Sequence, residues 1–142
     1  MKKCKQCGFE CSEFMAEQHF HKKKNSLESK CKKCVCTSRR AKALSDRITA
    51  LQKYSDSYIP SCACCGITDI YFLQIDHING GGAKHREELG EGGDRLVRWL
   101  KKNNYPTGFQ VLCANCNWSK SSHGQCAHEA ARKLKLAIHS GV

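Results

Sequence analysis

The stretch Leu73-Gln74-Ile75-Asp76-His77-Ile78 decides how the rest of the chain is interpreted, because it sets an acid beside an imidazole at the end of an apolar run. Its apolar and β-branched residues predict a strand over 71–78. A Cys-x-x-Cys pair precedes this strand and another follows it much later in the chain; the four residues are Cys62, Cys65, Cys113 and Cys116.

Two Cys-x-x-Cys pairs are the typical ligand set of a closed structural zinc site, so we expect these four thiolates to bind one Zn²⁺. Either Cys62 or Cys64 could pair with Cys65, and only Cys62 gives the x-x spacing. Such a site would bring the end of the first strand beside the residues that follow Cys116. Asp76, His77 and Asn117 would then be neighbours, although Asn117 lies 40 residues after His77.

Between and after these pairs we expect a turn or flexible loop, a second strand and three helices. Apolar residues of the last helix should form a buried stripe, and Trp99 and Trp118 are expected in the core. The expected segments are the loop 79–82, a helix over 95–102 capped by Asp94, a strand over 109–112, a helix over 117–122, and a last helix over 126–139 with Ala127, Ala131, Leu134 and Ile138 as its stripe. Residues 61–142 form this second module.

The N-terminal residues 1–36 repeat the cysteine pattern. Two further Cys-x-x-Cys pairs lie 23 residues apart, which is the spacing of a zinc ribbon, and Phe9, Phe14 and Phe20 between them could form a small apolar floor. The four expected ligands are Cys4, Cys7, Cys31 and Cys34. Spare candidates are Cys11, Cys36, His19 and His21. The neighbouring lysines are interpreted as phosphate contacts.

Residues 37–60 predict a connecting basic helix and a linker. Thr37 or Ser38 can cap a helix that continues to residue 55, and Pro60 ends the connection. One face of the helix carries the apolar residues Ala41, Leu44, Ile48 and Leu51 at helical spacing, which predicts a single buried stripe.

Composition favours a small, metal-stabilised, basic protein. The 142 residues contain 12 cysteines, 8% aromatics and a formal net charge of +11. Residues 1–53 hold 14 Lys/Arg against 5 Asp/Glu, so the positive charge lies mainly at the N-terminal end. That charge favours a polyanionic partner. The cysteine spacings indicate metal binding in a reducing cytosol rather than disulfides, and neither a signal peptide nor a membrane-spanning run is visible.

Asp76, His77 and Asn117 together suit phosphodiester hydrolysis. A carboxylate and an amide oxygen are hard ligands for Mg²⁺ or a similar cation, and two protein ligands leave coordination positions for water and a substrate phosphate. A neutral histidine beside that cation can accept a proton from the attacking water.

The motif Asp76-His77, followed by 109–113, Cys116, Asn117 and Lys120, resembles the HNH (ββα-metal) endonuclease family, and most of all the small zinc-bearing homing-type endonucleases of phages. The resemblance covers most of residues 62–120. It implies a small α+β, zinc-stabilised fold, in which an N-terminal Cys₄ zinc ribbon is joined by a helix to a ββα-metal domain.

The resemblance also implies residue roles. His77 would be the general base, Asp76 and Asn117 would hold a catalytic Mg²⁺ or Mn²⁺, and the two cysteine sets would hold two structural Zn²⁺. Lys120, His85 and Arg86 are candidate phosphate contacts, with a mobile surface loop as the alternative for the last two. The family's middle Asn position is Gly108 here, and Asn103 or Asn104 could brace the loop instead.

We therefore expect an enzyme that hydrolyses phosphodiester bonds of double-stranded DNA in a bacterial or phage-infected host cytosol. The alternative is a non-catalytic zinc-binding nucleic-acid module; a zinc deaminase fits poorly, because no His-x-Glu is expected at a strand-to-helix turn before the cysteine pair. The sequence leaves open the DNA target, nicking against double-strand cutting, whether the chain is a monomer or a homodimer, and the role of Cys126 and His128, whose spacing permits chelation.

Overall fold

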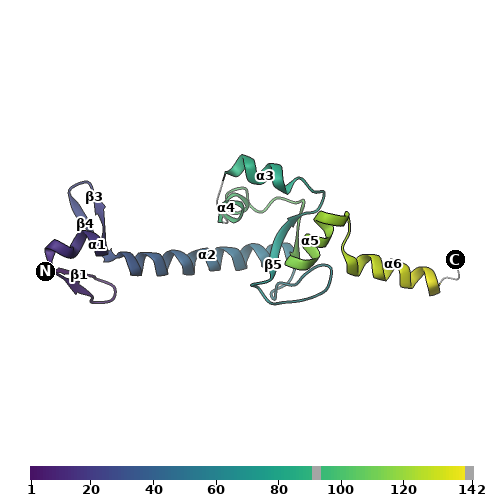
Figure 1. Ribbon diagram of the computed structural model, residues 1–142, viewed down its shortest axis with the longest axis horizontal. Helices are drawn as coiled ribbons and strands as arrows, with labels where there is room; N and C mark the ends of the chain where they lie inside the picture. Colours follow the sequence, from purple (N-terminus) through teal and green to yellow (C-terminus); the bar gives the residue numbers. More distant parts are fainter. Residues whose placement is uncertain (91–93, 140–142) are drawn as a thin grey trace. The chain divides into compact units, whose positions relative to one another are not determined.

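The computed structural model describes residues 1–90 and 94–139 and has two compact units, Met1–Ser45 and Asp46–Val142 (Figure 1). The described part is a small α+β chain with helices and three two-stranded sheets. The division between the units falls within one continuous helix, α2 (Lys32–Ser55). Within the described residues, no helix has both the length and the apolar character needed to cross a membrane.

The first unit is built from two short hairpins around a sulfur-rich core. Its elements before α2 are β1 (Lys2–Lys3), β2 (Glu10–Cys11), the 3₁₀ helix η1 (Glu13–Met15), α1 (Ala16–His19), β3 (Phe20–Lys23) and β4 (Ser26–Cys31). Phe20 is fully buried against Cys4, Cys31 and Cys34. Phe9 and Phe14 are 40% and 90% exposed, so the predicted three-phenylalanine floor is wrong for two of its members. The core of the first unit consists instead of Phe20 and the three buried cysteines around it.

Helix α2 begins earlier than predicted, at Lys32, directly after β4, so that Cys34 of the second cysteine pair lies in its first turn. Thr37 therefore lies inside the helix, where its hydroxyl donates to the carbonyl of Lys33 at 3.0 Å, and the predicted cap at Thr37 or Ser38 is wrong. Of the predicted buried stripe, Leu51 is buried and Ile48 half-buried, whereas Ala41 and Leu44 are exposed. The apolar spacing is real, but of this stripe only the residues in the last turns of the helix are shielded from solvent.

The second unit is centred on an antiparallel pair, β5 (Leu73–His77) and β6 (Phe109–Cys113). In their register Asp76 lies opposite Gln110, and His77 lies opposite Phe109. Helix α5 (Ala114–His123) follows β6 directly and packs against both strands. The buried core joins the strands to the cysteines and to the end of α2, and its members are Leu51, Cys62, Leu73, Val111, Leu112, Cys113, Cys116 and Cys126.

Two helices connect β5 to β6, α3 (Gly82–Leu89) and α4 (Asp94–Lys102). The expectation of a loop around His85 and Arg86 is wrong, because both residues lie on α3. Asp94 is the first residue of α4, and only Leu100 of that helix is buried. Trp99 is half-buried, but Trp118 is 67% exposed, so the prediction that it belongs to the core is wrong.

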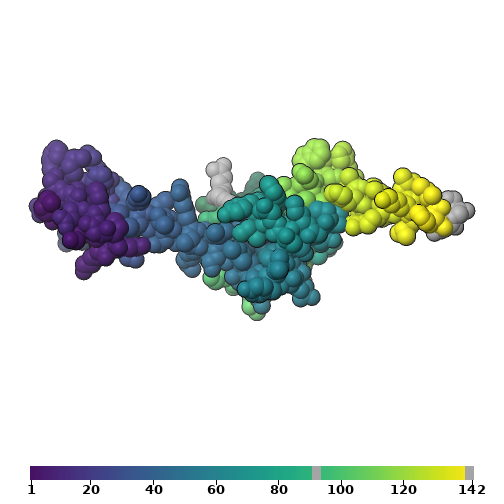
Figure 2. All heavy atoms as spheres, turned by 90° about the horizontal axis from the view of Figure 1, so that it is seen from below, coloured from purple at the N-terminus to yellow at the C-terminus, as the bar shows by residue number. Residues whose placement is uncertain are grey.

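The last helix, α6 (Ala127–His139), forms as predicted but without the predicted buried stripe. Leu134 and Ile138 are 64% and 68% exposed, and none of its residues is buried. In the space-filling view the yellow helix extends away from the rest of its own unit (Figure 2). Its attachment therefore depends on the residues at its beginning.

Candidate functional site

Each unit contains one group of four cysteines whose sulfur atoms converge, and both groups are the predicted sets. The Sγ atoms of Cys4 and Cys34 are 3.9 Å apart, and those of Cys7 and Cys31 are 3.8 Å apart. In the second unit the Sγ atoms of Cys65 and Cys113 are 3.7 Å apart. Zinc–sulfur bonds of about 2.3 Å in a tetrahedron place neighbouring sulfurs about 3.8 Å apart. Both groups could therefore hold zinc.

The first pair of each group forms a tight turn that ends in a glycine. The N–H of Gly8 donates to the carbonyl of Cys4 at 3.0 Å, and that of Gly66 donates to the carbonyl of Cys62 at 2.9 Å. Both glycines have left-handed φ values, 74° and 78°, which other residues adopt at a cost. The sequence Cys-x-x-Cys-Gly thus specifies the same turn twice.

The second pair of each group lies at the start of a helix. Cys113 is the N-cap of α5, and its sulfur accepts the N–H of Cys116 at 3.4 Å. In the first unit the N–H of Cys31 donates to the sulfur of Cys4 at 3.2 Å. This N–H is the main cause that lowers the pKa of the Cys4 thiol to about 6, because it stabilises the thiolate. Thiolate is the form that binds zinc.

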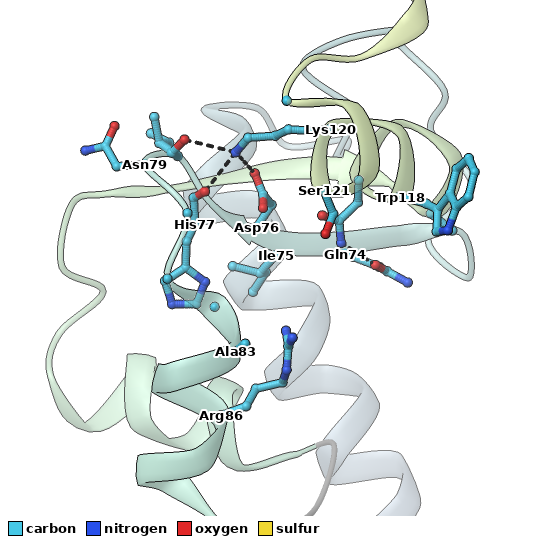
Figure 3. A pocket seen from close by; sticks show the side chains of 17 residues that line it. Gln74, Ile75, Asp76, His77, Asn79, Ala83, Arg86, Trp118, Lys120 and Ser121 are labelled. Atoms are coloured by element: carbon cyan, nitrogen blue, oxygen red, sulfur yellow. Dashed lines mark hydrogen bonds and ion pairs between the residues drawn. The ribbon is translucent and has the colours of Figure 1, made fainter.

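Beside the second cysteine group, β5 and α5 form the walls of a cleft with a volume of about 960 Å³. Asp76, His77, Asn117 and Lys120 line it together with Arg86 of α3 (Figure 3). The structure thus brings the three predicted catalytic residues to one surface. Asp76 and His77 lie at the end of β5, and Asn117 lies in the first turns of α5, directly after the cysteine pair Cys113 and Cys116.

Asp76 is held by two side-chain donors. The ammonium of Lys120 lies 2.6 Å from Asp76 Oδ2, and the amide of Gln110 donates to the same oxygen at 2.8 Å. Neither of these bonds uses Oδ1. Lys120 also donates to the carbonyls of His77 and Ile78 at 2.8 and 2.9 Å, as the dashed lines of Figure 3 show. Lys120 was predicted as a phosphate contact. In the structure it orients the Asp76 carboxylate and satisfies two backbone carbonyls at the end of β5.

His77 is enclosed by aromatic rings. Its Nε2 lies 2.8 Å from Nδ1 of His85, its ring centroid lies 4.6 Å from that of Phe109, and His85 in turn packs edge-on against Trp99. Burial lowers the pKa of His77, and the neighbouring His85 lowers it further. His77 is therefore neutral at neutral pH. His85, the other predicted phosphate contact on α3, is bonded to His77 instead.

Gly82 gives access to the second ring nitrogen of His77. A Cβ atom at this position would lie 3.0 Å from His77 Nδ1 and 3.5 Å from its Cε1. Glycine at the start of α3 therefore keeps the space beside Nδ1 clear.

Asn117 reaches the cleft but bonds to a residue that the sequence interpretation did not single out. Its Nδ2 donates to Oε1 of Gln74 at 2.7 Å. Gln74 lies two residues before Asp76 and so on the same face of β5. Gln110 was missed as well, although both glutamines could have been found by strand alternation and by pairing Asp76 with its cross-strand neighbour.

The loop before β6 is held by a backbone hydrogen bond and a tyrosine hydroxyl, and not by the Asn103 side chain. The side-chain amide of Asn103 donates to the carbonyl of Trp99 at 2.8 Å, near the end of α4. This hydrogen bond does not involve β5 or β6. Instead, the N–H of Ile78 donates to the carbonyl of Gly108, whose φ is 98°. The hydroxyl of Tyr54 also donates to the carbonyl of Pro106 at 2.9 Å.

Replacing Lys120 by methionine should lower the free energy of unfolding of the second unit by roughly 1–3 kcal/mol, because a half-buried carboxylate and two carbonyls lose a charged donor. Thermal unfolding of the zinc-loaded protein measures this loss. Lys133→Met is the matched control, because Lys133 pairs with Glu129 on an exposed helix face; its effect should stay within about 0.5 kcal/mol. Equal melting of the two variants would contradict the role of Lys120.

The chain matches no protein-family model, no curated protein and no solved structure. The function must therefore be argued from the cleft itself.

Proposed function

We propose that the chain is a divalent-metal-dependent DNA endonuclease of the HNH type, which hydrolyses phosphodiester bonds with His77 as general base. One observation carries the proposal: a neutral histidine, an oriented carboxylate and a carboxamide line the same cleft between β5 and α5. A module that only binds nucleic acid has no use for this combination. The order β5, β6, α5 around a cysteine cluster also supports the resemblance.

His77 is suited to accept a proton at Nδ1. When Nε2 carries the hydrogen and donates it to His85 Nδ1, the lone pair of His77 lies on its own Nδ1. Gly82 leaves room there for a water molecule. In that tautomer His85 accepts the hydrogen bond and holds the ring in place, and His77 takes the proton as that water attacks phosphorus.

Asp76 and Asn117 would hold the catalytic cation. Their oxygens are hard ligands that fit Mg²⁺ or Mn²⁺, and Gln74 fixes the Asn117 amide through its nitrogen, which leaves the amide oxygen to bind. Lys120 and Gln110 fix the Asp76 carboxylate through Oδ2. When bound, the cation would polarise the phosphate and stabilise the departing 3′-oxygen. The family resemblance implies 5′-phosphate and 3′-hydroxyl product ends.

Positive charge supports double-stranded DNA as the substrate. Arg86 of α3 is exposed and lines the cleft, where a guanidinium can bind a phosphate. The N-terminal 53 residues carry the excess of nine positive charges, although Lys22 and Lys23 are paired with Glu17 and Glu28. A basic segment of this kind binds phosphates independently of sequence.

The test is conversion of supercoiled plasmid by zinc-loaded protein after Mg²⁺ is added. Open-circular product would indicate nicking, and linear product would indicate double-strand cutting. Omission and re-addition of Mg²⁺ is preferable to EDTA, because EDTA also removes structural zinc. Plasmid that is bound but not converted would favour the non-catalytic zinc-binding module.

Gly82→Ala should reduce cleavage at least tenfold with only a small change in stability. The added methyl group would occupy the position of the water beside His77 Nδ1 and would lie 3.0 Å from that nitrogen, so the ring must shift slightly. Gly82 is the first residue of α3, where alanine gains less than the roughly 1 kcal/mol of a helix interior. Single-turnover cleavage and thermal unfolding, measured on the same preparation, separate the two effects. Unchanged cleavage would exclude water attack from this side of the ring.

A further inference from the structure

A third group of metal ligands lies against the second cysteine group and shares one of its members. Cys64, Cys116, Cys126 and His128 converge so that their ligand atoms all lie within 4.8 Å of one another. Cys116 belongs to both groups. Its sulfur is fully buried, and Cys126 is 4% exposed. Soft donors therefore surround a second point beside the Cys₄ group.

The spacing of these atoms fits a tetrahedral zinc ion. Nδ1 of His128 lies 3.5 Å from the sulfur of Cys116 and 3.4 Å from that of Cys126. Zinc bonds of about 2.3 Å to sulfur and 2.0–2.1 Å to nitrogen place such pairs about 3.6 Å apart in a tetrahedron. The donor set, three thiolates and one imidazole, is a common structural zinc set.

Three separate segments supply the ligands. Cys64 lies inside the turn that Cys62 and Cys65 form, and Cys116 lies in the first turn of α5. Cys126 precedes α6, where its carbonyl accepts the N–H groups of Glu129 and Ala130.

A buried serine fixes the connection between α5 and α6. The hydroxyl of Ser119 donates to the carbonyl of Gln125 at 3.3 Å and accepts the N–H of Ala127 at 3.0 Å. Gly124 makes the turn with a φ of 74°. Hydrogen bonds other than those among the ligands therefore hold Cys126 and His128 in place.

We propose that the second unit holds a binuclear zinc centre, in which Cys116 Sγ bridges the Cys62/Cys65/Cys113 ion to a second ion on Cys64, Cys126 and His128. The inference concerns structure and does not depend on nuclease activity. Six thiolates, two Zn²⁺ and a neutral imidazole give this centre a net charge of −2.

Arg132 of α6 offsets part of that charge. Its guanidinium donates to the sulfur of Cys64 at 3.5 Å and to the carbonyl of Cys64 at 2.8 Å. Outer-sphere donors of this kind orient metal ligands.

The second ion would anchor α6. No residue of α6 is buried, so apolar packing contributes little to its attachment. Its metal ligand, His128, and the contact of Arg132 both lie in its N-terminal half. Loss of the second ion should therefore free α6 and leave β5, β6 and α5 folded around the first ion.

Zinc content of the purified full chain tests the proposal. Wild-type protein should contain three Zn²⁺ per chain, one in the first unit and two in the second. Cys126→Ser and His128→Ala should each contain two, and His128→Cys should restore the third. The control Cys36→Ser should keep three, because Cys36 is exposed and outside all three groups. A zinc content of two per chain in the wild type, or of three in His128→Ala, would overturn the proposal of a second zinc ion in the second unit.

Cadmium-113 NMR of the wild type tests the bridge without any substitution. Full replacement of zinc should give three resonances, two of which split each other through the shared sulfur, and His128→Ala should remove one and collapse the splitting. Three unsplit resonances would refute a Cys116 bridge.

Limited proteolysis gives a further measure: His128→Ala should be cut within α6 faster than wild type, and equal cutting would contradict the anchoring role.

Discussion

His77→Ala should lose cleavage of supercoiled DNA by about 10²–10⁴-fold, which is the contribution that a positioned general base makes. The reason is geometric as well as chemical. His77 is neutral, its Nε2 faces His85, and its Nδ1 faces the space that Gly82 leaves open. Zinc content and DNA affinity should stay close to wild type, because His77 is neither a zinc ligand nor a cationic contact.

The measurement is a single-turnover rate at saturating protein, with gel-shift affinity and zinc content determined on the same sample. His139→Ala is the matched control, since His139 lies exposed at the end of α6, where its Nδ1 is hydrogen-bonded to the Lys135 carbonyl within the same helix. Its rate should equal that of wild type. His85→Ala should fall between the two, because it removes the hydrogen-bond partner that holds the His77 ring. Full activity in His77→Ala would exclude the general-base role.

Cys113→Ser should unfold the second unit. Structural zinc contributes roughly 10–16 kcal/mol of apparent binding free energy, which is as large as the usual 5–15 kcal/mol of net domain stability. Cys113 also caps α5 and lies in the core of the β5–β6 pair. The variant should retain the zinc of the first unit alone, whose ligands are separate.

Zinc content and two-dimensional NMR check this result. Resonances of residues 1–45 should keep their dispersion, and those of the second unit should collapse. Cys36→Ser, which also removes one thiol, should leave the spectrum and the melting curve unchanged. A fully loaded Cys113→Ser protein with normal melting would contradict the structural role of the second cysteine group.

The cysteine groups could be predicted from the sequence because their geometry is local. A Cys-x-x-Cys-Gly turn and a Cys-x-x-Cys helix start are each specified within five residues, and the metal chemistry then dictates how the pairs combine. The same reasoning predicted β5, β6 and the meeting of Asp76 with α5. It also assigned Cys62 rather than Cys64 to the first metal group of the second unit.

The partners inside the cleft were harder to predict, because the pairing of Gln110 requires the strand register and the pairing of His85 requires a helix that the glycine run does not indicate. Gln110 reaches Asp76 only in the observed register, and His85 reaches His77 only because Gly82 begins a helix. The glycine run suggested a loop there. The apolar spacing of α6 likewise predicted burial, but Leu134 and Ile138 meet no partner surface among the described residues. Periodicity reports which face is apolar, and tertiary contacts decide whether that face is buried.

The most direct test of the central claim is the rate of supercoiled-plasmid conversion as a function of Mg²⁺ concentration, for zinc-loaded wild type and Asp76→Asn. Asn is nearly isosteric with Asp, so it keeps the shape of the cleft, but it removes the charge that would hold the cation and, with it, the ion pair to Lys120. Wild type should convert the plasmid in a saturable, Mg²⁺-dependent manner, and Asp76→Asn should bind DNA but stay inactive at every concentration. A wild-type protein that never converts the plasmid, or an Asp76→Asn protein that cuts as fast as wild type, would contradict the account.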